Sequence, residues 1–89
     1  MAPFRWNDWN LGHIGEHGVL AHEAEEVLAG ARRPYPERMG DGKFRVRGPS
    51  VGDRLLQVIF ILDPPDTIYV IHARDLTPNE KRQYRRRTR

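Results

Sequence analysis

Three absences limit what this sequence can encode. It contains no cysteine, so neither a disulfide framework nor a zinc site built from thiolates is available to it. No apolar run approaches the roughly 20 residues that cross a membrane, and residues 1–6 lack the apolar core of a signal peptide. We therefore expect a protein of the reducing cytoplasm that has no membrane segment.

The composition is that of one small soluble domain. Of the 89 residues, 38% are hydrophobic and 30% are charged, which is typical of a globular chain rather than a disordered one. A chain of this length forms a single hydrophobic core. We therefore predict one domain that covers residues 1–89.

The net charge of +3 is unevenly distributed along the chain. Residues 1–31 have one basic and five acidic side chains, and residues 55–80 have one basic and four acidic ones. In contrast, residues 32–54 have seven basic and three acidic side chains, and residues 81–89 have six basic side chains and no acidic one. If the fold brings the two basic segments together, they form a positive face suited to RNA or DNA. The alternative is a solvated tail beside a charged surface hairpin.

Apolar periodicity and turn residues predict two short helices, a meander of strands and a closing helix. Asn7 or Asp8 caps the first helix and Gly18 ends it, while Gly30 ends the second. Short edge strands are expected at residues 4–6 and near Tyr35. The main expected elements are helices at 8–17 and 20–29, strands at 43–47, 54–62 and 67–74, and a helix at 78–87.

Together these elements predict an α+β fold: a small antiparallel sheet of three to four strands, with the two N-terminal helices on one face and a C-terminal helix. The first main strand alternates, so that Phe44 and Val46 face the core while Lys43, Arg45 and Arg47 face the other way. We expect this second face to be partly open and to be lined by those three cations and by Gln57.

The segment from strand to closing helix concentrates ionisable groups. Thr77, Pro78 and Glu80 form the start of a helix, with a capping box between the Thr and the Glu. His72 and Arg74 are two residues apart and therefore share a strand face. Such a pair could move a proton while the guanidinium holds a phosphate, as cleavage of RNA through its 2′-hydroxyl requires. The alternative is that His72 is a satisfied core residue and Arg74 pairs with a carboxylate such as Asp75 or Glu80.

Other motifs favour structural roles. His13 and His17 match the zinc-protease pattern H-x-x-E-H, but the helix that contains them is short and no third ligand is evident, so we predict no metal site. A histidine packed under Trp9 or placed at a helix C-terminus explains them better. Trp6 and Trp9 are expected in the core rather than as platforms for bases.

The sequence resembles the BrnT family of bacterial type II toxins over nearly its whole length. The resemblance lies in the following residues, which occur in the family's order: Trp6–Asn7, Asn10, His17–Gly18–Val19, Ala24–Glu25, Arg45–Val46–Arg47–Gly48, Ala73–Arg74 and Glu80–Lys81–Arg82–Gln83–Tyr84. It implies a RelE-like fold and a metal-independent endoribonuclease, which needs no cofactor and inhibits translation by cleaving RNA. It also implies a cognate antitoxin of the ribbon-helix-helix type that binds DNA, and it is compatible with a homo-oligomer.

The resemblance and the residue chemistry together define the candidate site. The expected catalytic residues are Arg74, His17, His72, Glu80 and Tyr84, although Tyr84 could equally be a packing anchor of its helix. The expected contacts to nucleic acid are Arg45, Arg47, Arg54, Lys81 and Arg85. The alternative is a non-catalytic module that binds RNA or a protein partner through the same basic face.

Overall fold

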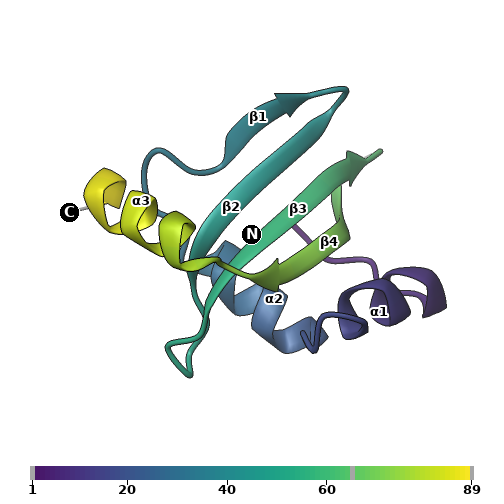
Figure 1. Cartoon of the computed structure of the whole chain (residues 1–89). Coiled ribbons are helices and arrows are strands. Elements are labelled where there is room, and N and C mark those ends of the chain that lie inside the picture. The colour runs from purple at the N-terminus through teal and green to yellow at the C-terminus, as the bar shows by residue number, and fades with distance from the viewer. Residues whose placement is uncertain (1, 65, 89) are drawn as a thin grey trace.

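The computed structural model describes residues 2–64 and 66–88, which form three helices and one four-stranded sheet (Figure 1). In chain order the elements are α1 (Asp8–Gly15), α2 (Ala21–Ala29), β1 (Glu37–Gly40), β2 (Lys43–Pro49), β3 (Leu55–Asp63), β4 (Thr67–Asp75) and α3 (Pro78–Thr88). Within the described residues, no helix is long and apolar enough to cross a membrane.

The helix boundaries follow local capping chemistry. The Asn7 side chain accepts a hydrogen bond from the Asn10 N–H at 3.2 Å, and the Asn10 side chain accepts one from the Asn7 N–H at 2.8 Å. This reciprocal box starts α1. The helix ends at Gly15, and Gly18, at φ +71°, makes the turn into α2, a backbone conformation that glycine adopts at little cost. α2 ends at Gly30, as predicted.

The sheet is an antiparallel meander with strand order β1-β2-β3-β4. The short edge strand expected near Tyr35 begins two residues later, at Glu37, after Pro36, which has no N–H to donate to a strand ladder. The edge strand predicted at residues 4–6 is reduced to a single parallel bridge between Phe4 and Ile68. The α+β prediction is confirmed, and the sheet reaches the upper end of its predicted size.

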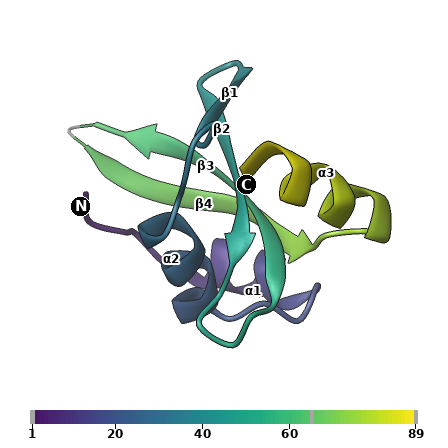
Figure 2. The same ribbon diagram turned by 90° about the vertical axis from the view of Figure 1, so that its left-hand side faces the viewer.

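The core lies between the sheet and the N-terminal helices. α2 packs against β2 and β3, whereas α1 lies along β4. We call the sheet face toward α2 the inner face, and its opposite the outer face; α3 lies on the outer side (Figure 2). Fully buried side chains of the core include Ile14, Val19, Val27, Val46, Leu56, Val58 and Val70.

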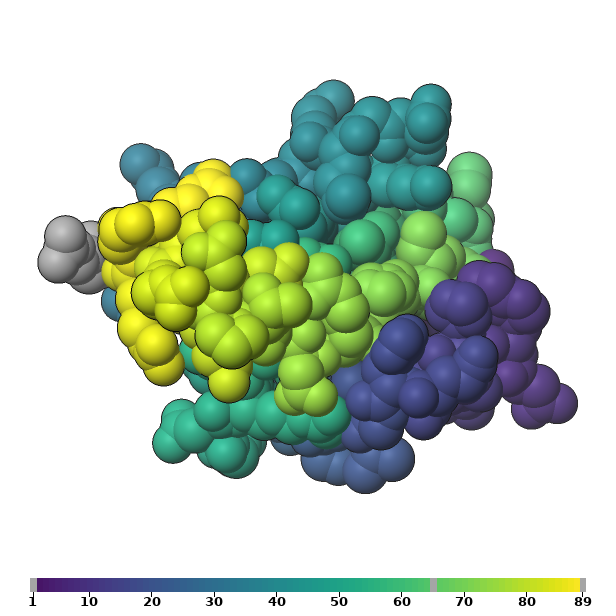
Figure 3. Space-filling model, in the orientation of Figure 1, coloured from purple at the N-terminus to yellow at the C-terminus, as the bar shows by residue number. Residues whose placement is uncertain are grey.

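α3 covers one end of the outer face, and β4 lies between it and α1 in the space-filling view (Figure 3). None of the residues Pro78–Thr88 is buried, although Tyr84 packs against the core, so this helix is held by that contact together with polar ones. Its position corrects one prediction: Arg47 and Gln57 do not line an open face but are 7% and 5% exposed. They are buried because α3 folds back over their end of the sheet, whereas Lys43 remains exposed.

Candidate active site

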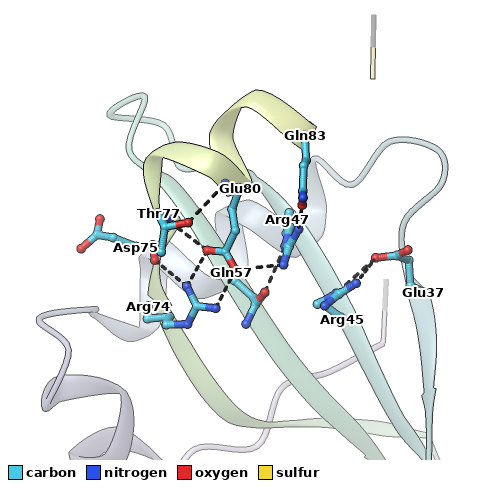
Figure 4. A network of polar contacts seen from close by, with 9 residues as sticks. All are labelled: Glu37, Arg45, Arg47, Gln57, Arg74, Asp75, Thr77, Glu80 and Gln83. Atoms are coloured by element: carbon cyan, nitrogen blue, oxygen red, sulfur yellow. Dashed lines mark hydrogen bonds and ion pairs between the residues drawn. The ribbon is translucent and has the colours of Figure 1, made fainter. Parts of the chain in front are cut away.

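A row of polar side chains crosses three strands on the outer face beneath α3. Arg47, Gln57 and Arg74 are register partners on β2, β3 and β4, so their side chains lie next to one another. We call these three residues the polar row. Glu80 reaches down from α3 and accepts hydrogen bonds from Arg74 at 2.7 and 2.9 Å and from Arg47 at 3.1 Å (Figure 4). Gln57 accepts a further bond from the Arg47 Nε at 3.0 Å.

Glu80 holds this position because it also begins its helix. The Glu80 N–H donates to the Thr77 hydroxyl at 3.2 Å, and the Thr77 N–H donates to the Glu80 carboxylate at 2.9 Å. The predicted capping box is therefore present. The Arg74 hydrogen bonds, with smaller contributions from the Thr77 N–H and Arg47, lower the pKa of Glu80 to about 2 in spite of its burial. At neutral pH two guanidinium groups thus share one carboxylate, which leaves the group one net positive charge.

Arg74 retains a free hydrogen-bonding edge. Its Nη1 donates to Glu80 and to the Asp75 carbonyl at 3.0 Å, and its Nη2 donates to Glu80. A guanidinium has five N–H donors. The Nε hydrogen and one Nη2 hydrogen therefore find no acceptor among residues 2–64 and 66–88. These two hydrogens form one side of the planar fork, the geometry that binds a phosphate in a bidentate manner.

Two histidines lie beside the polar row. His72 precedes Arg74 by two residues on the same face of β4 and pairs in register with Ile59. The ring of His17, from the turn after α1, is centred 5.6 Å from the His72 ring at an interplanar angle of 64°. Burial lowers the pKa of His72 below its usual 6.5, and the charges of Arg74, His17 and His13 lower it further. His72 is therefore a neutral imidazole at pH 7 that can accept a proton.

Arg54 positions the turn that contains His17. Its Nη1 donates to the Gly18 carbonyl at 2.8 Å, and its Nη2 donates to the His17 carbonyl at 3.4 Å. The same guanidinium makes ion pairs with Asp75 at 2.8 Å and with Glu23 at 3.2 Å, and the Asp75 hydrogen bonds raise the pKa of Arg54. Arg54, which was predicted to contact RNA, thus connects the turn after α1 to the end of β4.

The remaining predicted residues lie around this centre. The Tyr84 ring stacks on Tyr35 with centroids 6.2 Å apart, which is the packing role left open by the sequence, and it is not brought to the histidines. Arg45 pairs with Glu37 at 3.0 Å. Lys81 and Arg85 are four residues apart on α3 and share one side of it; Arg85 is exposed and Lys81 is half-buried.

Comparison with known proteins identifies the fold. Neither a family model nor a curated protein sequence matches the chain. Among solved structures, the crystal structure of the Brucella abortus ribonuclease toxin BrnT superposes with a TM-score of 0.69. The alignment covers 86% of this chain and 99% of that chain, with 19% sequence identity. This chain has the BrnT fold. The fold implied by the sequence resemblance is therefore supported by the backbone architecture.

On this BrnT fold, the surface beside α1 differs from the sequence prediction. Trp6 is half-buried, and its indole donates to Glu25 at 2.7 Å, but Trp9 is 55% exposed rather than part of the core. Its ring stacks on His13, with centroids 4.8 Å apart, which agrees with the prediction of a histidine packed against Trp9. The phase of α1 is set by Ile14, which is fully buried and turns Trp9 outward.

Two features of the BrnT-fold site were missed by sequence reasoning. Glu37 joins β1 to α3, because it accepts from Arg45 at 3.0 Å and from Arg87 at 2.8 Å, and the Arg87 and Arg45 hydrogen bonds lower its pKa despite the opposing effect of burial. Tyr69 was expected only as a strand residue, yet its ring approaches Trp9. The i, i+4 spacing of Trp9 and His13 was the available signal for a shared surface.

Proposed function

We propose that this protein is the toxin of a type II toxin-antitoxin system and that it acts as a metal-independent endoribonuclease. The observation on which the proposal depends is the proximity of a neutral His72, an exposed His17 and the free edge of Arg74 on one side of β4. A base, a second proton carrier and a phosphate-binding cation are what cleavage of an RNA strand needs. The similarity in fold to a ribonuclease toxin supports the same assignment.

In the proposed reaction, His72 removes the proton from a ribose 2′-hydroxyl, and the 2′-oxygen forms a bond to the adjacent phosphorus. The bond from phosphorus to the 5′-oxygen breaks, and His17 donates a proton to that leaving oxygen. The products are a 2′,3′-cyclic phosphate and a free 5′-hydroxyl. Both proton carriers are side chains of this protein, so the reaction as written uses no metal ion.

Arg74 is proposed to bind the phosphate oxygens through its Nε and Nη2 hydrogens and to stabilise the charge that develops on them. Glu80 then acts as a positioning residue, since it fixes the opposite edge of that guanidinium. Arg47 supports Glu80 from beneath α3 rather than contacting RNA. Lys81 and Arg85 are proposed to contact the RNA backbone, and Arg45 is proposed to do so from β2.

The test is an RNA cleavage assay with the purified protein in the presence of a chelator. We expect the wild type to cleave RNA, Arg74→Ala to lose about 10²- to 10³-fold in rate, as removal of a charge-stabilising donor typically does, and His72→Gln to be inactive. The matched control is Arg33→Ala, which removes an exposed arginine from the loop before β1. Intact RNA after incubation with wild-type protein of native circular dichroism would contradict the proposal.

We further propose an antitoxin partner of the ribbon-helix-helix type. The observation that supports it is the fold similarity to a toxin, together with a basic surface that an acidic segment can cover. Coexpression with the product of a small adjacent reading frame should suppress RNA cleavage. If wild-type protein shifts RNA in a gel without cleaving it, and Arg74→Ala shifts it equally well, the protein is a binding module instead.

A further inference from the structure

A row of stacked rings lies on the surface where α1 meets β4. The Trp9 and His13 rings are nearly parallel, at 9°, with centroids 4.8 Å apart, and the Trp9 and Tyr69 rings are 6.2 Å apart at 19°. We call Tyr69, Trp9 and His13 the ring strip. The guanidinium of Arg5 lies 4.0 Å above the Tyr69 ring and continues the strip at that end.

Packing of the core does not account for this arrangement. Trp9 is 55% exposed, although an indole is among the most costly side chains to leave in water. The residues that fix α1 to the protein are Ile14 and Asn10, both fully buried on its other side. Leu11, on the same helix, is also exposed. The ring strip is therefore a surface feature with flat, nearly parallel faces.

The ring strip lies beside the proposed catalytic histidines. Tyr69 and His72 occupy the outer face of the same strand, opposite Ile61 and Ile59 of β3. His17 follows His13 by four residues and contacts the His72 ring. His13 is close enough to His72 for its charge to disfavour protonation of that ring. The strip and the reacting groups thus form one continuous surface across the edge of β4.

We propose that the ring strip is a binding subsite for one unpaired nucleobase of an RNA strand, which stacks against the exposed part of the Trp9 ring while a phosphate farther along the same strand lies at Arg74. This inference rests on the proposed ribonuclease function and specifies the substrate as single-stranded RNA. Stacking on an aromatic face is available to every base but is blocked when the base is inside a duplex. Flat rings beside the proposed catalytic histidines fit single-stranded RNA, since a base finds a stacking partner there and the strand can continue to the free edge of Arg74.

The experiment measures binding separately from cleavage by using a 2′-O-methyl RNA oligonucleotide, which has no free 2′-hydroxyl to attack the phosphate. We expect this strand to quench indole fluorescence. The quench should disappear in Trp9→Phe, where Trp6 is the remaining indole, while the affinity is largely retained because a phenyl ring also stacks. Trp9→Ala should weaken binding about 5- to 150-fold, the usual range for loss of one stacked base. Leu11→Ala, an exposed apolar truncation on the same helix, should bind as the wild type does.

Several outcomes would overturn the inference. The first is that Trp9→Ala and Leu11→Ala bind RNA with equal affinity. The second is that an abasic strand or a duplex quenches the indole fluorescence as strongly as the single strand does. The third is that Trp9→Ala weakens the binding of a protein partner but not the binding of RNA. If Trp9→Ala binds normally and the wild type cleaves RNA, the subsite is wrong and the proposed function stands. If the wild type shows the Trp9 quench but cleaves no RNA, the subsite stands and the proposed function is wrong. Circular dichroism of each variant establishes that α1 is folded.

Discussion

Replacing Glu80 by glutamine removes the charge that the two arginines share and keeps the shape of the side chain. The pKa of Glu80 falls from 4.5 to about 2 in the folded protein, and each unit corresponds to about 1.4 kcal/mol. The charged carboxylate therefore stabilises the fold by up to about 3 kcal/mol at neutral pH. Because the Glu80 side chain is only 17% exposed, solvent screens little of this interaction.

The pH dependence has a definite sign. A carboxyl whose folded pKa is depressed stabilises the protein above its unfolded pKa, and this stability is lost as the pH falls through the folded pKa. For Glu80 the loss should occur between about pH 4.5 and about pH 2. We expect Glu80→Gln to be less stable than the wild type at pH 7 and to lose less stability over the acid range. The free energies of unfolding of the two proteins should become equal near pH 2.

Urea unfolding followed by circular dichroism at a series of pH values measures this difference. With a slope of about 1 kcal/mol per molar urea for a small domain, the midpoint of Glu80→Gln at pH 7 should fall by about 2–3 M. Glu16→Gln serves as the control, since Glu16 is exposed at the end of α1. If Glu80→Gln and wild type differ by the same free energy at pH 7 and at pH 2.5, then the charge of Glu80 does not act as described.

Three further predictions concern activity and binding. The loss of cleavage rate on acidification, which reports protonation of His72 as the base, should lie below pH 6.5. A loss on acidification that begins above pH 7 would contradict the role of His72 as the base. Arg54→Ala should destabilise the fold by about 1–3 kcal/mol in urea unfolding, because Asp75 and Glu23 lose their partner. It should also slow cleavage, because the turn that contains His17 is no longer held; unchanged activity would show that this turn does not need Arg54. Lys81→Ala and Arg85→Ala should each reduce the salt dependence of binding to single-stranded RNA, by about 0.7 in the slope of log affinity against log salt, with no change in the urea midpoint; an unchanged slope would place these side chains away from the RNA.

The elements that local chemistry determines were predictable from the sequence. The capping box of Thr77 and Glu80 and the terminal glycine of α2 act over three or four residues, so the sequence shows them directly. The alternation of β2 correctly placed Arg45 and Arg47 on the face opposite Val46. The burial of Arg47 was not predictable, because it depends on where α3 docks, and that contact joins residues more than 30 positions apart.

The residues of the candidate site were likewise predictable where local spacing determines their positions, and not where tertiary packing does. His72 and Arg74 share a strand face by spacing alone, and the structure shows this arrangement. The approach of His17 to His72 depends on how α1 meets β4. Trp9 was predicted to be buried because large aromatic side chains usually are. Apolar residues occur around much of the short α1, so its sequence did not specify which side would face the core.

The edge strand β1 has a consequence for how the protein behaves at high concentration. Exposed strand edges are templates on which further chains can pair and aggregate. β1 is only four residues long, and its register with β2 shifts between Arg38 and Gly40. Arg38 is exposed on that strand. A short, irregular and charged edge disfavours the addition of another strand, so this edge of the sheet should resist growth into larger β-assemblies during expression and storage.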